Sequence, residues 1–197
     1  MSTSTQLLDT LAAFDKANQE DPNREQVDGK SVAKEYLYGL RMSERLQQFC
    51  PDASEVLQLA VRAQHIRRWD IPRSDYPMNR TGYRQWRSRL GVYHGEVAGA
   101  IMAAHGYGQG DVDRVQALLS KSNLKRDPEV QTLEDVACLV FLEHYLEEFA
   151  RKHEQSKLIN ILRKTWRKMS PEGQQAALAL PLSDSIKTLL EHALQTD

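Results

Sequence analysis

The chain has 197 residues and a formal net charge of −1, because 26 lysines and arginines stand against 27 acids. Its hydrophobic share of 41% and charged share of 27% exclude a disordered tail protein, and residues 1–197 suit a single domain with a sizeable core. The near-zero charge argues against a nucleic-acid binder that uses its whole surface. Two cysteines are too few for a disulfide framework or a zinc ribbon.

The apolar residues follow the helical period, and no alternating stretch is long enough to predict a strand. This pattern predicts an all-α fold, a bundle of about eight to nine helices. The first two helices are expected over residues 4–19 and 31–49, joined by a loop over residues 21–29. Pro51 ends the second helix, because Cys50, as the residue before a proline, is pushed out of the helical region.

The middle of the chain predicts two further helices around a long connection. Asp52, with an acid three residues later, has capping-box spacing and starts a helix that ends near Arg68. Residues 69–82 contain two prolines and a glycine, so we expect a long connection of the kind that often carries function. The next helix is expected over residues 83–105, with Gly106 as the residue that ends it.

Two strong start signals mark the last part of the chain. Asp127 before Pro128, and Ser170 before Pro171, each pair a capping side chain with a proline in the first helical turn. The helix that begins at Asp127 is expected to reach about Arg151. The remaining helices are expected over residues 111–120 and 156–169, in a short stretch after Ser170, and over residues 183–195.

The N-terminal stretch has no basic region followed by an apolar one, so it does not resemble a secretory signal. The longest apolar run, residues 136–142, is too short to span a bilayer. We therefore expect a cytoplasmic protein with no membrane partner. Cys50 and Cys138 are expected to be free thiols, with Cys138 in the core.

Residues 62–89 concentrate positive charge, with eight arginines and two acids, a local charge of +6. A guanidinium binds phosphate through two parallel hydrogen bonds and stacks on aromatic rings, so this segment predicts a phosphate site. The alternative is a solvated surface paired with the seven acids of residues 129–154. The phosphate-binding candidates are Arg62, Arg67, Arg68, Arg73, Arg84, Arg87, Lys121 and Lys125.

Three polar residues lie on apolar faces of expected helices: His65, His94 and Asp135. Burying a charge is costly unless it is paired or bound to metal, so these positions are unusual. Imidazole and carboxylate together could hold one divalent transition metal such as Fe, Mn, Ni or Zn. Taken singly, each position is better explained as a hydrogen-bonded core residue, and the three together favour a site, so a protein without a metal stays open.

Several motifs resemble a known family. They are Ala-Val-Arg-Ala-Gln-His-Ile-Arg-Arg-Trp-Asp-Ile-Pro-Arg at 60–73, Gly-Tyr-Arg-Gln-Trp at 82–86 and Leu-Glu-Asp-Val-Ala-Cys-Leu-Val-Phe-Leu-Glu at 133–143. Together they resemble an uncharacterised bacterial and fungal family, domain of unknown function 4202. The resemblance covers nearly the whole chain and brings no established activity.

More distantly, the order of elements resembles the HD superfamily of all-α, metal-dependent phosphohydrolases. His65 falls where the His of that superfamily's His-Asp doublet would stand, with Ile66 in place of the Asp. Tyr38 falls near its first His, Asp135 at its later Asp, and His94 resembles an additional His of many members. The resemblance implies an HD-like core and at most a single metal, held by His65, His94 and Asp135.

These features support alternative functions. In a phosphohydrolase acting on a nucleotide or other phosphorylated small molecule, the metal would activate a water, with Glu96 or Glu134 as a base or further ligand. Without catalysis, the arginine-rich loop would bind a phosphorylated ligand or RNA. A third possibility is an interaction protein whose arginines pair across a subunit interface. The sequence leaves the oligomeric state open.

Overall fold

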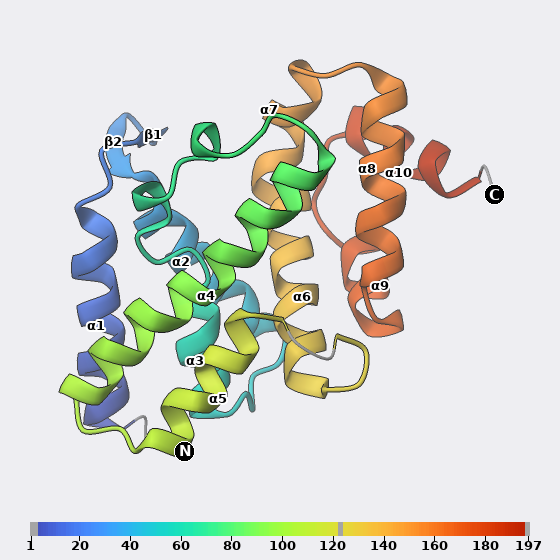
Figure 1. Ribbon diagram of the computed structural model, residues 1–197. Helices are drawn as coiled ribbons and strands as arrows, with labels where there is room; N and C mark the ends of the chain where they lie inside the picture. The colour runs from blue at the N-terminus through green and yellow to red at the C-terminus, as the bar shows by residue number, and fades with distance from the viewer. Residues whose placement is uncertain (1–3, 122–123, 196–197) are drawn as a thin grey trace. The chain divides into compact units, whose positions relative to one another are not determined.

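The computed structural model describes residues 4–121 and 124–195, and helices make up most of these ranges (Figure 1). The predicted all-α fold is confirmed, with ten α-helices in the described residues, slightly more than expected. The chain divides into two compact units, Met1–Ser122 and Asn123–Asp197. The organisation of residues 1–197 as one domain stays a prediction.

The N-terminal unit is built from five α-helices, a short hairpin and two single-turn 3₁₀ helices, as far as its described residues extend. In chain order they are α1 (Thr5–Gln19), β1 (Arg24–Val27), β2 (Lys30–Ala33), α2 (Lys34–Phe49), α3 (Glu55–Arg62), η1 (Arg68–Asp70), η2 (Arg73–Asp75), α4 (Arg80–Ala104) and α5 (Gln109–Leu119). Helix α1 buries Leu7, Phe14 and Asn18 at helical spacing, which turns one face toward the unit's core.

The hairpin is the first departure from the sequence prediction, which placed a loop over residues 21–29. Strands β1 and β2 pair antiparallel, with Arg24 opposite Ala33. The two residues between them, Asp28 and Gly29, both have positive φ, at 50° and 75°. Asp-Gly with positive φ at both positions is the favoured two-residue hairpin turn, so the signal was present in the sequence. The second helix therefore begins at Lys34 rather than at residue 31.

Helix α3 is shorter than predicted. Its cap is Ser54, whose side chain accepts the Leu57 N–H at 3.2 Å, so the assignment of the cap to Asp52 was wrong. The helix ends at Arg62, and consecutive turns follow, in which Arg67 takes a left-handed conformation with φ 49°. The Asn18 side chain accepts the Arg67 N–H at 3.0 Å and holds this turn. The result places His65 on a turn rather than on a helix.

Helices α4 and α5 pack closely because three glycines of α4 face α5. A Cβ at Gly91 would lie 3.1 Å from the Leu119 carbonyl oxygen, and a Cβ at Gly99 would lie 2.9 Å from a Val112 methyl group. Gly95 lies one turn from each of them, and a Cβ at Gly95 would likewise lie close to the Gln116 side chain of α5. This spacing sets the C-terminal end of α5 directly against the middle of α4. The prediction that Gly106 ends α4 is confirmed, with φ +85°.

The C-terminal unit comprises α6 (Pro128–Val140), a π-helical turn η3 (Phe141–Tyr145), α7 (Leu146–Arg151), α8 (Gln155–Lys168), α9 (Pro171–Leu178) and α10 (Asp184–Gln195). Both predicted start signals are confirmed. Asp127 accepts the Glu129 N–H at 3.0 Å, and Ser170 accepts the Gly173 N–H at 3.0 Å. The helical path that starts at Asp127 continues through the π turn as far as Arg151, as predicted.

In the part of the chain that the structure describes, no helix combines the length and the apolar character needed to cross a bilayer. Cys50 and Cys138 are free thiols, and Cys138 is buried, as the sequence predicts.

Candidate functional site

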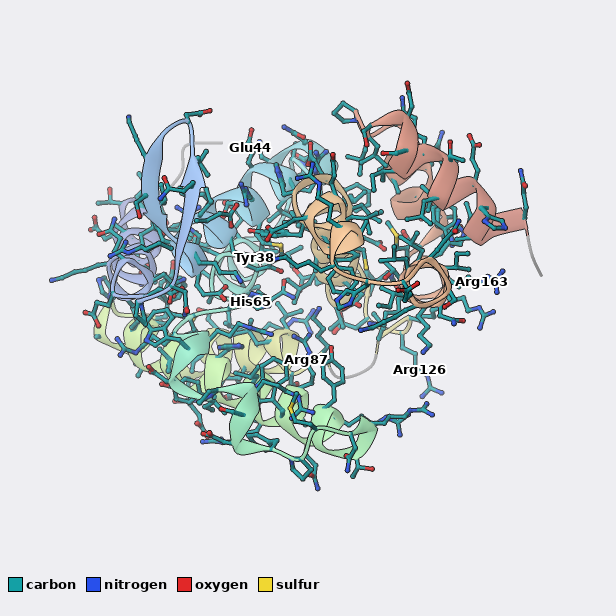
Figure 2. The ribbon with its side chains drawn as sticks, turned by 90° about the horizontal axis from the view of Figure 1, so that it is seen from above. Tyr38, Glu44, His65, Arg87, Arg126 and Arg163 are labelled. Atoms are coloured by element: carbon teal, nitrogen blue, oxygen red, sulfur yellow. The ribbon has the colours of Figure 1, made fainter. Side chains whose placement is uncertain are left out.

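His65 lies in a tightly packed setting inside the N-terminal unit. Its ring stacks on Tyr38 of α2, with ring centroids 4.0 Å apart, and the two residues are neighbours in Figure 2. The Glu35 Oε2 atom lies 3.0 Å from His65 Nδ1, and the Arg68 Nη1 atom lies 3.2 Å from His65 Nε2. An arginine only donates, so Nε2 accepts and Nδ1 carries the proton that is donated to the carboxylate. Both ring nitrogens of His65 are therefore engaged.

A buried aspartate places Glu35. Asp21 is fully buried, and its carboxylate accepts the N–H groups of Glu35 at 3.0 Å and Asn23 at 2.9 Å. The cap residue of α2 makes no side-chain hydrogen bond of its own, so Asp21 caps this helix from outside it. Asn18 adds a bond from its amide to the Glu35 carbonyl at 3.4 Å. The hairpin connection thus fixes the first turn of α2 and directs Glu35 toward His65.

Arg68 links this pair to α4. Its guanidinium lies over the Trp86 ring at 4.6 Å, a cation–π contact, and its Nε atom is 3.9 Å from Glu35 Oε1. The Trp86 indole N–H donates to the Ile71 carbonyl at 2.9 Å, which anchors the connecting segment to α4. Burial is the main reason that the pKa of Arg68 is lowered. The Arg68 guanidinium thus contacts Glu35, His65 and Trp86, and these four residues are called the His65 cluster below.

His94 is the second imidazole of this region, with its ring centroid 6.0 Å from that of His65. Its Nδ1 atom lies 2.7 Å from the Ile66 carbonyl oxygen. A carbonyl only accepts, so Nδ1 carries the proton and Nε2 holds a lone pair. Burial lowers the pKa of His94 to about 3, which keeps the ring neutral at pH 7. Among the described residues, Nε2 has no hydrogen-bond partner.

Burial and nearby charges shift the pKa values of His65 and Glu35. The pKa of His65 is lowered well below its usual value, first by burial and then by the nearby positive charges of Arg68, Arg87 and Lys121. Burial raises the pKa of Glu35, against the attraction of Arg68. Burial thus dominates both shifts, and the positive charges of Arg68, Arg87 and Lys121 add to the lowering of the His65 pKa.

A cavity of about 200 Å³ lies next to His94 in the N-terminal unit. Its walls come from the turn before η1, from the middle of α4, and from the end of α5 with the residues that follow it. They are Gln64, Arg87, Ser88, Leu90, Gly91, His94, Leu119, Ser120 and Lys121.

Two polar side chains of this cavity have unusual surroundings. The buried Gln64 Oε1 atom has no hydrogen-bond partner within the described residues. Arg87, labelled in Figure 2, has neither an ion pair nor a hydrogen bond within them.

Residues 9–190 match the model of a protein family described as a domain of unknown function, DUF4202. The chain belongs to this family. The resemblance drawn from the motifs at 60–73, 82–86 and 133–143 is thereby confirmed. No curated protein and no solved structure matches the chain.

In this DUF4202 chain, two of the predicted phosphate-binding arginines are engaged in internal salt bridges. Arg62 forms a bidentate pair with Asp15, at 2.7 and 2.8 Å. Arg67 contacts Glu20 at 2.6 Å and Asp70 at 2.8 Å. Both guanidinium groups are satisfied by carboxylates of their own unit, and this structural role competes with any anion.

The other predicted cations have varied surroundings. Arg73 donates to the carbonyls of Tyr76 at 2.8 Å and Pro77 at 2.7 Å, and so organises the connection before α4. Arg84 is exposed on α4. Lys125, in the C-terminal unit, donates to the Arg167 carbonyl at 2.7 Å. Of the eight candidates, the structure brings Arg87 and Lys121 to one cavity.

Asp135 belongs to the C-terminal unit and is buried there. Its Oδ1 atom accepts the Ser170 N–H at 2.8 Å and the Gln131 amide at 3.1 Å. Burial raises the pKa of Asp135. The carboxylate ties the turn between α8 and α9 to α6. A structural hydrogen-bond role therefore accounts for a polar side chain on this apolar face.

The two glutamates predicted as a base or further ligand also lie in ion pairs. Glu134 Oε1 is 3.3 Å from Lys168 Nζ, and Glu96, exposed on α4, is 3.3 Å from Arg89. Neither residue lines the cavity beside His94.

The side chains in place do not fit the predicted metal site. The structure brings His65 and His94 together, but the Nε2 lone pair of His65 is used by Arg68. Within the described part of each unit, no three His, Cys, Asp or Glu side chains are grouped as metal ligands would be. We therefore derive no step that involves a metal.

Sequence reasoning missed Glu35, which contacts His65, and Asp21, which positions Glu35, as well as Gln64, Ser88 and Ser120 at the cavity. The four-residue spacing of Gly91, Gly95 and Gly99 would have indicated that another helix approaches α4 closely. No local signal marks Glu35, because its position depends on the hairpin and on Asp21.

Proposed function

We propose that the N-terminal unit binds a small phosphorylated molecule in the cavity between α4 and the end of α5. The phosphate group would be held by Arg87 and Lys121. One observation carries the proposal: Arg87, a half-buried cation with no partner among the described residues, lines a cavity together with a second cation. The positive charges of Arg87 and Lys121 both lower the pKa of His65, so their electrostatic effect reaches the interior of the unit.

The size of the cavity favours a small ligand. About 200 Å³ is below the ~300–1,000 Å³ of pockets for drug-sized ligands, so a phosphate ester of a few carbons suits it better than a dinucleotide. Hydroxyl groups of Ser88 and Ser120 at the wall add donors of the kind that phosphate oxygens accept. RNA is less favoured, because Arg62, Arg67 and Arg73 of the arginine-rich segment are held by internal partners.

The proposal is binding rather than hydrolysis. A general base works best with a pKa near the working pH, and the pKa of His94 is about 3. The residues that line the cavity include no carboxylate. Phosphohydrolase activity, with or without a metal, is the alternative, and it would require a base from elsewhere.

Calorimetric titration with inorganic phosphate, propyl phosphate and glycerol 3-phosphate tests the proposal. Hydrogen bonds to charged groups contribute about 1.5–3 kcal/mol, so Arg87→Gln should weaken the tightest of these ligands roughly ten- to hundredfold. Arg84→Gln is the matched control, because Arg84 is exposed on the same helix and outside the cavity. It should leave the affinity unchanged.

Three results would overturn the proposal. The first is no saturable binding of any of the three ligands. The second is an equal loss of affinity in both arginine variants. The third is tighter binding of a single-stranded RNA oligonucleotide with a steep dependence on salt, which would favour the RNA alternative.

A further inference from the structure

Two buried hydrogen-bond acceptors stand at the same cavity. Gln64 Oε1 and His94 Nε2 are both buried from water and have no partner within the described residues, and both side chains line the cavity. Buried polar atoms are satisfied in the great majority of cases, so two exceptions at one cavity require an explanation. A bound group that donates hydrogen bonds would satisfy both.

The direction of these hydrogen bonds is fixed for His94. Its Nδ1–H is donated to the Ile66 carbonyl, and its ring is neutral at pH 7 because burial lowers its pKa to about 3. Nε2 therefore accepts and cannot donate. The oxygen of the Gln64 side chain is likewise an acceptor only.

The charges around the cavity decide what kind of donor fits. Arg87 and Lys121 line the cavity, and Arg68 lies against the neighbouring His65. An ammonium group on the ligand would be repelled by these cations, whereas a neutral hydroxyl would not. The cavity thus combines cations for an anion with acceptors for hydroxyl groups.

We infer that the ligand is a phosphorylated polyol, whose phosphate is bound by Arg87 and Lys121 and whose hydroxyls donate to Gln64 Oε1 and His94 Nε2. This inference rests on the proposed function and names its ligand class. A site built to bind hydroxyl groups discriminates strongly against the analogue that lacks them, because its buried acceptors are then left unpaired.

The experiment compares phosphate esters that differ only in their hydroxyl groups. Glycerol 3-phosphate is paired with propyl phosphate, and erythritol 4-phosphate with butyl phosphate, each titrated by calorimetry against the full chain. We expect at least a tenfold preference for the hydroxylated member in one pair. Equal affinities within both pairs would overturn the inference while the proposed function stands. Failure of all four to bind would instead overturn the proposed function.

A variant assigns the preference to its residue. Gln64→Leu keeps the approximate size of the side chain and removes the unpaired acceptor, so the ligand-free protein should melt at the same or a higher temperature. The preference should fall to less than threefold, while the affinity for the alkyl phosphate stays within threefold. Gln85→Leu, at an exposed position of α4 outside the cavity, should preserve the preference. A tenfold preference that persists in both Gln64→Leu and His94→Phe would overturn the assignment to these two acceptors.

Discussion

Replacing Asp21 by alanine tests whether this buried carboxylate organises the N-terminal unit. Asp21 is fully buried and accepts the N–H groups of Asn23 and Glu35. Asn23 is exposed, so water replaces the two bonds lost there, from its backbone N–H and from its side-chain amide, at a total cost of about 1 kcal/mol. The N–H of Glu35 is left without a partner in the interior, which costs about 1–3 kcal/mol. The free energy of unfolding should therefore fall by roughly 2–4 kcal/mol.

Urea denaturation and a thermal melt measure this loss. For a chain of this length, each kcal/mol corresponds to about 2–4 °C, so the melting temperature should fall by roughly 4–16 °C. Asp21→Asn keeps one acceptor oxygen and should lose less. Asp9→Ala, at an exposed position of α1, should stay within about 0.5 kcal/mol of the native protein. A loss below about 1 kcal/mol in Asp21→Ala would refute the role given to this carboxylate.

Three further changes test other parts of the structure. The pKa values of His65 and His94 are lowered, so the unfolded chain binds more protons and these two imidazoles should make stability fall as pH drops from 6.5 to 5, by up to about 1.4 kcal/mol per pH unit for each. Denaturation at several pH values should show a slope that is smaller by up to about 1.4 kcal/mol per pH unit in His94→Gln, and an unchanged slope would contradict it. Arg87→Gln removes a positive charge near Arg68 and should raise the free energy of unfolding by on the order of 0.5 kcal/mol, and a lower free energy of unfolding would count against this repulsion. Gly173→Ala places a Cβ 2.6 Å from Asp135 Oδ1 and should cost about 1–3 kcal/mol in urea denaturation, whereas Gly110→Ala, which meets nothing within 4 Å, should not destabilise.

Local signals in the sequence were sufficient at several points where one residue decides the backbone, although the cap predicted at Asp52 lies at Ser54 instead. Asp127 and Ser170 begin their helices as predicted, because a cap needs only its own side chain and the next turn. Gly106 ends α4 for the same kind of reason, a positive φ that suits glycine. The Asp28-Gly29 turn is equally local, and its signal was overlooked.

The candidate site could be predicted only in part, because its members come from distant segments. Helical periodicity found His65 and His94 as polar residues of the interior, and their rings do lie near each other. The sequence predicts His65 as a metal ligand, whereas in the structure Glu35 and Arg68, from separate segments, occupy both of its ring nitrogens. Charge counting gave eight equivalent cations, and only tertiary contacts separate Arg62, held by Asp15, from Arg87 at the cavity.

Because Trp86 contacts Arg68, its intrinsic fluorescence can be used to follow the surroundings of Arg68 inside the N-terminal unit. Trp86 is 8% exposed, its ring faces the guanidinium at 4.6 Å, and its N–H is anchored to the Ile71 carbonyl. Indole emission depends on nearby charge and on contact with water, so the fluorescence of this residue follows the state of the His65 cluster. With Trp69 and Trp166 replaced by phenylalanine, Trp86 would be the one remaining emitter, and its fluorescence would report whether the surroundings of Arg68 change when inorganic phosphate is added.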